Sequence, residues 1–336
     1  PRHTIDTTGV SSGGNTGFET DFSNAFLVSA TCPTDRYVPL SNPEGIPGAV
    51  GCGFGYADIS MQTGGIDRQS TYLSATYEVD ANNSVYFESR YSKIASFGRY
   101  APAVGFTGVG ADNAFNPKGH AALGDVDGNG MLDDGRGIFI FHRFVGHGNR
   151  DDSLSTSEFD NVAGLKGNFN VAGGINYDVY LRHYEYLSQE EGDVYVIRSI
   201  IEDLISSGDY DFSNPLSQDQ DHLAAVAQSS GTLFRAIKTE YDAFGLTVDG
   251  SFLELPAGQV GWAAGIERAH ESYQDQYDSF REAGNVLGSA GNSSAGSRSR
   301  WAAFAEVQIP VLDNLEVNIA GRYDDYSDFG DEFSPQ

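Results

Sequence analysis

The stretch DVDGNGMLDDGR, residues 125–136, has the residue types and spacing of a calcium-binding loop. An EF-hand-type loop takes oxygen ligands from its positions 1, 3, 5, 7 and 9, which are here Asp125, Asp127, Asn129, the backbone carbonyl of Met131, and Asp133. Gly130 stands at the sixth position, where such a loop turns sharply. The pattern therefore predicts a calcium site.

The same stretch departs from the pattern at its end. Arg136 occupies the twelfth position, where a bidentate Glu is expected, and Asp134 is the available substitute. The alternative is a solvated turn of Asp and Gly residues. On either interpretation the segment orders a surface loop and performs no catalysis, so no cofactor is required.

Other residues that could carry chemistry lack the necessary spacing. The seven histidines are scattered, and His142 and His147 are five apart, unlike the two ligands of an HExxH zinc site. Each histidine is expected to be hydrogen-bonded inside the fold or to face solvent. No nucleophile elbow and no phosphate-binding loop occurs. The chain is therefore not expected to be an enzyme.

The two cysteines, Cys32 and Cys52, flank a loop rich in Pro and Gly. An even count in such a setting predicts one disulfide that closes a surface loop in an oxidising compartment. The alternative is two unrelated thiols in a reducing compartment. No His or further Cys lies near them at the spacing of a metal cluster.

Composition excludes some classes of partner. The 336 residues carry 20 Lys and Arg against 47 Asp and Glu, a formal charge of −27. Nucleic-acid binding depends on basic residues that neutralise phosphates, so no nucleic-acid partner is expected. With 18 Tyr and 21 Phe, the chain is too aromatic for a disordered acidic polymer. It contains no apolar run of about eighteen residues, the length of a membrane-spanning helix.

Residues 301–323 show the alternation of a β-hairpin. Val307, Ile309, Val317 and Ile319 share one face, and the opposite face is polar, with Glu306, Gln308, Asn318 and Arg322. A connection at 310–314 contains Pro and Asn, which suit a turn. A soluble sheet with one face on a core and a membrane barrel with lipid outside both produce this pattern.

Short and long connections alternate along the whole chain. Short ones are expected at 80–83, 171–174, 256–259 and 310–314, and long ones at 101–158 and 188–232. Residues 194–208 have apolar residues at helical spacing and predict a short amphipathic helix within a loop. The parity of 233–254 changes between Tyr241 and Leu246, which predicts a bulge or an insertion.

Long connections gathered at one end are typical of an outer-membrane barrel, with short periplasmic turns and long extracellular loops. The fold class expected is therefore all-β, an antiparallel transmembrane β-barrel segment. The Val307 face then meets lipid and the Glu306 face a wet lumen. A closed barrel satisfies every backbone hydrogen bond within lipid.

At residues 253–278, LELPAGQVGWAAGIERAHESYQDQYD, and 301–330, WAAFAEVQIPVLDNLEVNIAGRYDDYSDFG, the chain resembles the β-barrel of TonB-dependent outer-membrane receptors. Further similar segments are 73–103 and 141–152. The Cys32/Cys52 loop also has a counterpart in many members. Gln259 and Trp262 depart from the family's usual residues without disturbing the pattern.

The resemblance implies a receptor that binds a scarce nutrient in extracellular loops and imports it with energy from the TonB-ExbB-ExbD system. Residues 1–336 are then an internal part of the barrel, with the plug domain and the C-terminal strands absent, in contact with outer-membrane lipid. Ferric siderophores, cobalamin, oligosaccharides and peptides remain open as ligands. Tyr180, Tyr184 and Tyr186 either stack on the ligand or form the barrel's aromatic girdle.

Two alternatives to an energy-coupled receptor stay open. One is a passive or adhesive outer-membrane barrel that binds calcium through Asp125–Asp133. The other is a secreted soluble β-protein stabilised by calcium and by the Cys32–Cys52 bridge. The one-ended long loops favour a barrel over the soluble protein.

Overall fold

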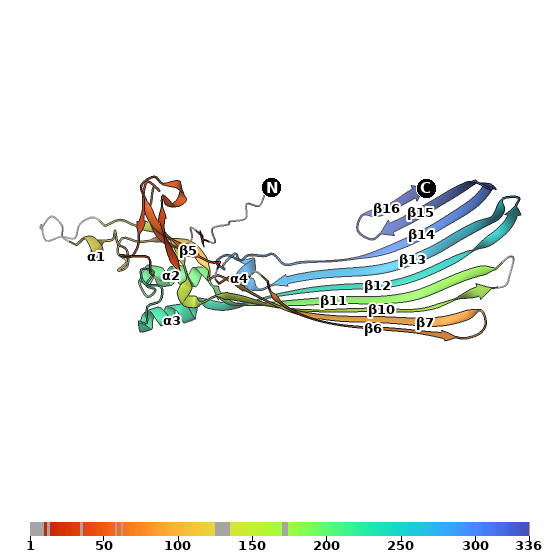
Figure 1. Ribbon diagram of the computed structural model, residues 1–336, viewed down its shortest axis with the longest axis horizontal. Coiled ribbons are helices and arrows are strands. Elements are labelled where there is room, and N and C mark those ends of the chain that lie inside the picture. The colour runs from red at the N-terminus through yellow and green to blue at the C-terminus, as the bar shows by residue number, and fades with distance from the viewer. Residues whose placement is uncertain are drawn as a thin grey trace.

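The computed structural model describes residues 10–11, 14–33, 36–57, 59–61, 63–124, 135–169 and 174–335. Most of them form one antiparallel sheet of nine strands, in the order β16-β15-β14-β13-β12-β11-β10-β7-β6 (Figure 1). The strands are β6 (Gly65–Glu78), β7 (Asn83–Tyr100), β10 (Arg150–Phe169), β11 (Ile175–Val196), β12 (Ser230–Leu255), β13 (Gly258–Tyr277), β14 (Ser294–Leu312), β15 (Leu315–Tyr326) and β16 (Gly330–Pro335).

The short connections lie at one end of this sheet, as expected from the sequence. They join β6 to β7, β10 to β11, β12 to β13 and β14 to β15, and each falls within a few residues of its predicted place. Three long connections, 101–149, 197–229 and 278–293, lie at the other end, where 327–329 form a short one. The sheet is open among the described residues, because β6 and β16 each pair on one side.

The predicted long loops are shorter than 101–158 and 188–232. Strand β10 already begins at Arg150, β11 continues to Val196, and β12 begins at Ser230. These polar strand ends lack apolar alternation, so they resemble loop in the sequence. They extend because the backbones of β10 and β11 stay paired as far as Asp151 and Asp193. The predicted helix at 194–208 is confirmed as α2 (Arg198–Ser207).

The long connections and the N-terminal segment fold together at one end of the sheet (Figure 1). We call this part the loop module; it comprises the described residues of 10–61, 101–149, 197–229 and 278–293. Its strands are β1 (Val10–Ser11), β2 (Asn15–Glu19), β3 (Ala25–Leu27), β4 (Tyr37–Ser41), β5 (Val50–Gly55), β8 (Val104–Val109) and β9 (Ile138–Arg143). Its helices are η1 (Pro43–Gly45), α1 (His120–Leu123), η2 (Val145–His147), α2, α3 (Gln220–Ser229) and α4 (Ser279–Glu282).

The loop module has a hydrophobic core of its own. Ile138 and Ile140 of β9 pack with Ile201 and Ile205 of α2, and all four side chains are buried. Helix α2 forms because its apolar residues recur at helical spacing, and Gly208 ends it in a left-handed conformation at φ 84°. Burial of this apolar face stabilises a helix of ten residues, which would be marginal in isolation.

The nine-stranded sheet has one apolar face. The register places one residue from each strand in a single uncharged row: Tyr77, Val85, Leu165, Val179, Leu246, Ile266, Ala303, Tyr323 and Phe333. Side chains of this face are strongly exposed, for example Leu181 at 63% and Ile319 at 57%. We call it the apolar face and the opposite side the polar face.

The hairpin at 301–323 confirms the predicted parity. Val307 pairs with Ile319, and Ile309 pairs with Val317, on the apolar face. On the polar face the Asn318 side-chain amide donates to Glu306 at 2.6 Å. The interpretation of the sequence as an alternating hairpin therefore holds residue by residue.

The predicted bulge near Tyr241 is wrong. Strand β12 pairs with β11 without interruption from Leu233 to Gly250. The alternation in the sequence changes because the side chains on one face of β12 change from polar, at Asp242, to apolar, at Phe244. The strand enters the apolar part of that face between these two residues. The shift that does occur in β12 lies between Ser251 and Leu253.

Candidate functional site

The predicted calcium loop lies outside the described residues, and its ligands stay a prediction. The chain on both sides of it is held together: the Arg136 amide donates to the Lys118 carbonyl at 2.9 Å. The Asn116 side chain donates to the Arg136 carbonyl at 2.8 Å. In the part of the chain that the structure describes, no group of three His, Cys, Asp or Glu side chains is placed to hold a metal.

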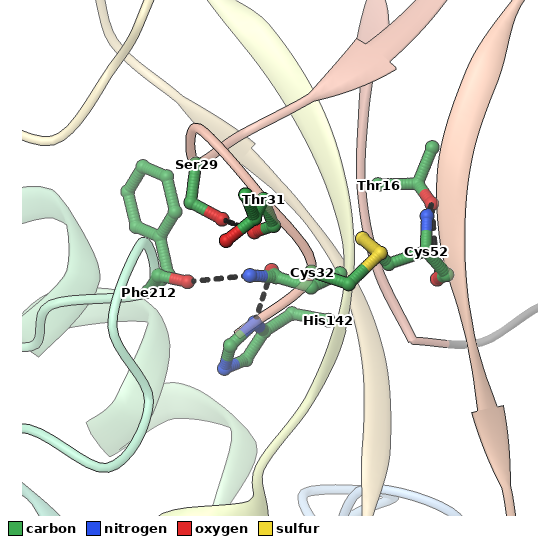
Figure 2. The surroundings of a disulfide bond; sticks show 8 residues. Thr16, Ser29, Thr31, Cys32, Cys52, His142 and Phe212 are labelled. Carbon is green, nitrogen blue, oxygen red and sulfur yellow. Dashed lines mark hydrogen bonds between the residues drawn. A yellow bond between two sulfur atoms is a disulfide. The ribbon is translucent and has the colours of Figure 1, made fainter. Parts of the chain in front are cut away.

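The Cys32–Cys52 disulfide is confirmed, with Cα atoms 5.7 Å apart. It joins the segment after β3 to strand β5. Thr16 of β2 accepts from the Cys52 amide at 3.0 Å and donates to its carbonyl at 3.2 Å, beside the bridge (Figure 2). The bridge therefore ties together two of the small sheets of the loop module.

A buried histidine at the centre of the loop module joins three distant segments. The Asn15 amide donates to the Phe212 carbonyl at 3.1 Å, so its oxygen accepts from His142 Nδ1 at 2.9 Å. His142 Nε2 then accepts from the Tyr210 hydroxyl at 2.9 Å. These partners require the neutral imidazole. Figure 2 shows His142 between the Phe212 backbone and the disulfide region.

Two further histidines lie close by. His147 Nε2 donates to the Ser229 hydroxyl at 2.8 Å, because that hydroxyl donates onward to the Ala225 carbonyl at 2.7 Å. His147 Nδ1 is buried with no hydrogen-bond partner. His222 stacks on Tyr210 with ring centroids 4.6 Å apart and accepts from the Asp211 amide at 3.1 Å.

Burial holds these histidines neutral. Desolvation lowers the pKa of His142 to about 3 and that of His147 to about 4, with smaller contributions from the nearby basic side chains. The pKa of His222 is also lowered, again mainly by desolvation. The loop module thus depends on three uncharged imidazoles in a packed interior.

Backbone contacts between the connections make the loop module a single unit. The Leu287 amide donates to the Val196 carbonyl at 3.0 Å, and the Arg198 amide donates to the Asn285 carbonyl at 3.0 Å. Asn113 donates to the Ile205 carbonyl, which joins the 101–149 and 197–229 connections. The long connections therefore form a fixed cap at one end of the sheet.

The polar face carries a series of ion pairs, all of which join neighbouring strands except Arg322–Asp324, which lies within β15. Arginines pair with acids at Arg182–Asp160, Arg235–Asp275, Arg298–Glu271, Arg300–Glu267 and Arg322–Asp324. Three of these pairs are bidentate, with both contacts between 2.8 and 3.0 Å at Arg182, Arg235 and Arg322. Such a surface is hydrated and polar, as the lumen of a barrel requires.

Where the polar face meets the loop module, charged and aromatic side chains gather. Arg281 of α4 is 3% exposed, donates to Glu190 at 2.9 Å and lies 5.6 Å from the Tyr195 ring. The Tyr195 hydroxyl donates to Asp152 at 3.0 Å. Arg281 Nε is buried without a hydrogen-bond partner, and Asp278 Oδ2 lies 3.9 Å from it. We call these residues, with Tyr277 and Arg235, the mouth cluster; Arg235 lies 4.6 Å over the Tyr277 ring.

The three tyrosines Tyr180, Tyr184 and Tyr186 lie on the polar face. They alternate with Val179 and Leu181, which belong to the apolar face, and they share the side of Arg182. The aromatic-girdle interpretation is therefore wrong for them. They remain available to stack against a polar or planar molecule on this face.

The hydrogen-bonded network around His142 and the mouth cluster were not found from the sequence. His142 was predicted to be satisfied or exposed, and it is hydrogen-bonded inside the fold. Its partners Asn15 and Tyr210 lie 127 and 68 residues away along the chain, so no local spacing signals them. None of the helices in the described ranges is long and apolar enough to cross a membrane.

A comparison with protein families agrees with this architecture. Residues 124–336 match the family described as TonB dependent receptor-like, beta-barrel. The chain belongs to this family of TonB-dependent receptor β-barrels. The solved structure of a mutant ferric enterobactin receptor from Pseudomonas aeruginosa matches with 13% identity and a TM-score of 0.24. That match covers 86% of this chain and 43% of the receptor, so the chain spans less than half of it. No curated protein matches the sequence.

Proposed function

We propose that this segment is part of an outer-membrane receptor that binds a scarce nutrient and imports it with energy delivered by TonB. The observation that carries the proposal is the combination of an apolar sheet face with long connections gathered into one fixed cap. A sheet with one apolar and one hydrated face suits lipid outside and water inside. In this proposal the loop module and the mouth cluster lie at the end of the sheet where a ligand enters from outside.

The partners follow from the family. TonB, ExbB and ExbD would act through a plug domain, and the nutrient is a ferric siderophore, cobalamin, an oligosaccharide or a peptide. The ion pairs and tyrosines of the polar face favour a hydrophilic ligand that exchanges hydrogen bonds along the lumen. The protein performs no covalent chemistry in this proposal.

The test is uptake of labelled nutrients by cells that carry or lack the complete receptor. A siderophore loaded with ⁵⁵Fe, labelled cobalamin and labelled maltooligosaccharide are offered in parallel, in strains with and without TonB. We expect one nutrient to accumulate only when both the receptor and TonB are present. Uptake that persists without TonB would favour the passive barrel, and a water-soluble, detergent-free monomer would favour the secreted β-protein.

A second proposal concerns the Asp loop at 125–133, which we infer binds calcium and orders the 101–149 connection. Two observations support this inference. The ligand spacing matches a calcium-binding loop, and the Arg136 amide donates to the Lys118 carbonyl, which holds the two sides of the loop together. In the complete receptor, calcium is expected to protect residues 101–149 from protease, and Asp127→Ala is expected to remove that protection. Asp112→Ala, outside the loop, is the matched control. Protection that is the same with and without calcium would contradict the site.

A further inference from the structure

A cavity of about 500 Å³ opens on the apolar face, at the boundary between apolar and polar side chains. Its lining spans two adjacent rows of the sheet. One row is apolar and contains Phe87, Ala163, Leu181 and Phe244. The next row towards the loop module is polar and contains Asn161, His183, Asp242 and His270. The cavity therefore offers an apolar floor below a polar rim.

Arg268 is the unusual member of the lining. It stands in the apolar row, opposite Phe244 on one side and Trp301 on the other. Its guanidinium lies 5.1 Å over the Trp301 ring, and no carboxylate pairs with it in the described part of the chain. Arg182 and Arg235 on the polar face, by contrast, are each paired with an acid on a neighbouring strand.

The other charged groups of the cavity are already engaged. Asp242 accepts from His183 Nδ1 at 2.7 Å, and His270 Nδ1 lies 3.1 Å from the Ser299 hydroxyl. Arg268 is thus the cation that is left to attract an anion. An arginine stacked on a tryptophan at the edge of an apolar band is suited to a phosphate, which it can bind with two parallel hydrogen bonds.

We propose that this cavity binds an anionic, phosphate-bearing lipid of the leaflet nearer the loop module. Arg268 holds the phosphate, the Asn161 and His270 side chains bond the headgroup, and an acyl chain lies against Leu181 and Phe244. The ligand is a lipid and not free phosphate because the floor of the cavity is apolar and continuous with the apolar face. The inference rests on the proposed membrane location.

The test uses the complete receptor in nanodiscs of phosphatidylcholine, with or without phosphatidylglycerol. After transfer to detergent, native mass spectrometry counts the phosphatidylglycerol molecules that stay bound. One basic group near a lipid surface contributes enough for about a five-fold change in affinity, so Arg268→Gln is expected to lower retention about five-fold. Arg268→Lys keeps the charge but loses the two parallel hydrogen bonds, so its retention is expected to lie between that of the native receptor and that of Arg268→Gln.

Lys166→Gln is the matched control, because it removes one positive charge from the polar face, where Lys166 lies 5.5 Å over the Tyr86 ring. Equal retention in Arg268→Gln and Lys166→Gln would overturn the proposal, as would equal retention of phosphatidylcholine and phosphatidylglycerol. Displacement of the lipid by inorganic phosphate would reassign the cavity to a soluble anion. Failure of the native receptor to enter any nanodisc would instead contradict the membrane location itself.

Discussion

Replacing Ile319 by arginine is expected to lower the free energy of unfolding of the complete barrel by about 2–4 kcal/mol, the cost of a cation at mid-bilayer on the lipid side of a strand. Ile319 is 57% exposed on the apolar face and pairs with Val307. Val307 lies within the run of apolar-face residues from Trp301 to Ile309 in β14. Val317, one row nearer the turn, is expected to cost less as arginine, because the penalty falls towards the membrane surface.

The measurement is a urea titration of the receptor folded into phosphatidylcholine vesicles. Asn318→Arg is the control: it adds the same charge at the neighbouring residue, on the polar face, where Glu306 is in hydrogen-bonding reach of the native side chain. That variant is expected to stay within about 0.5 kcal/mol of the native protein, as surface substitutions usually do. An equal loss in both variants, or no loss in Ile319→Arg, would mean that this face does not meet lipid.

Strand positions were predictable where burial or lipid imposes a period of two. Val307, Ile309, Val317 and Ile319 alternate strictly, and the structure pairs them as predicted. The period disappears where a strand leaves the apolar band. Residues 150–157 form the start of β10, yet both faces there are polar, and backbone pairing alone keeps them extended. A pattern of apolar residues therefore does not predict how far a strand extends beyond the apolar part of the sheet.

In the candidate site, too, local features were predictable from the sequence and contacts between distant segments were not. Helix α2 was predictable because the apolar spacing of Ile201 and Ile205 is local. What covers that apolar side was not predictable, since the covering residues come from β9, far away in sequence. Asn15 and Phe212 are hydrogen-bonded across 197 residues. Only the fold brings such pairs together, so the packing of the loop module and the mouth cluster could be identified only from the structure.

The buried histidines make the loop module sensitive to acid. In the unfolded chain each imidazole takes up a proton near its ordinary pKa of 6.5, whereas burial holds the pKa of His142 at about 3 and that of His147 at about 4. Above pH 6.5 neither state is protonated and the contribution to stability is complete. Between pH 6.5 and those lowered values the unfolded state binds more protons, so stability is lost as the pH falls.

At pH 5 each group lies about 1.5 pH units below its unfolded pKa, which costs about 2 kcal/mol per histidine and about 4 kcal/mol for both. Protonation of His147 would also place a second N–H at Nδ1, which has no partner in the described surroundings. Hydrogen exchange of the α2 and α3 amides in the complete receptor, corrected for intrinsic rates, measures this opening. We expect the opening equilibrium to rise roughly a thousand-fold between pH 7 and pH 5.

Two variants separate this effect from general loss of structure at low pH. His142→Gln removes one titrating group, so the slope of opening free energy against pH is expected to fall by the contribution of one proton, about 1.4 kcal/mol per pH unit, even if the variant is less stable at pH 7. His120→Gln removes a histidine that is outside the buried cluster, with 36% of its side chain exposed, and is expected to leave the slope unchanged. A native protein whose α2 and α3 amides open equally at both pH values would show that the neutral imidazoles do not hold the cap closed. A slope unchanged by His142→Gln would instead assign the acid sensitivity to another buried group such as His222, which stacks on Tyr210.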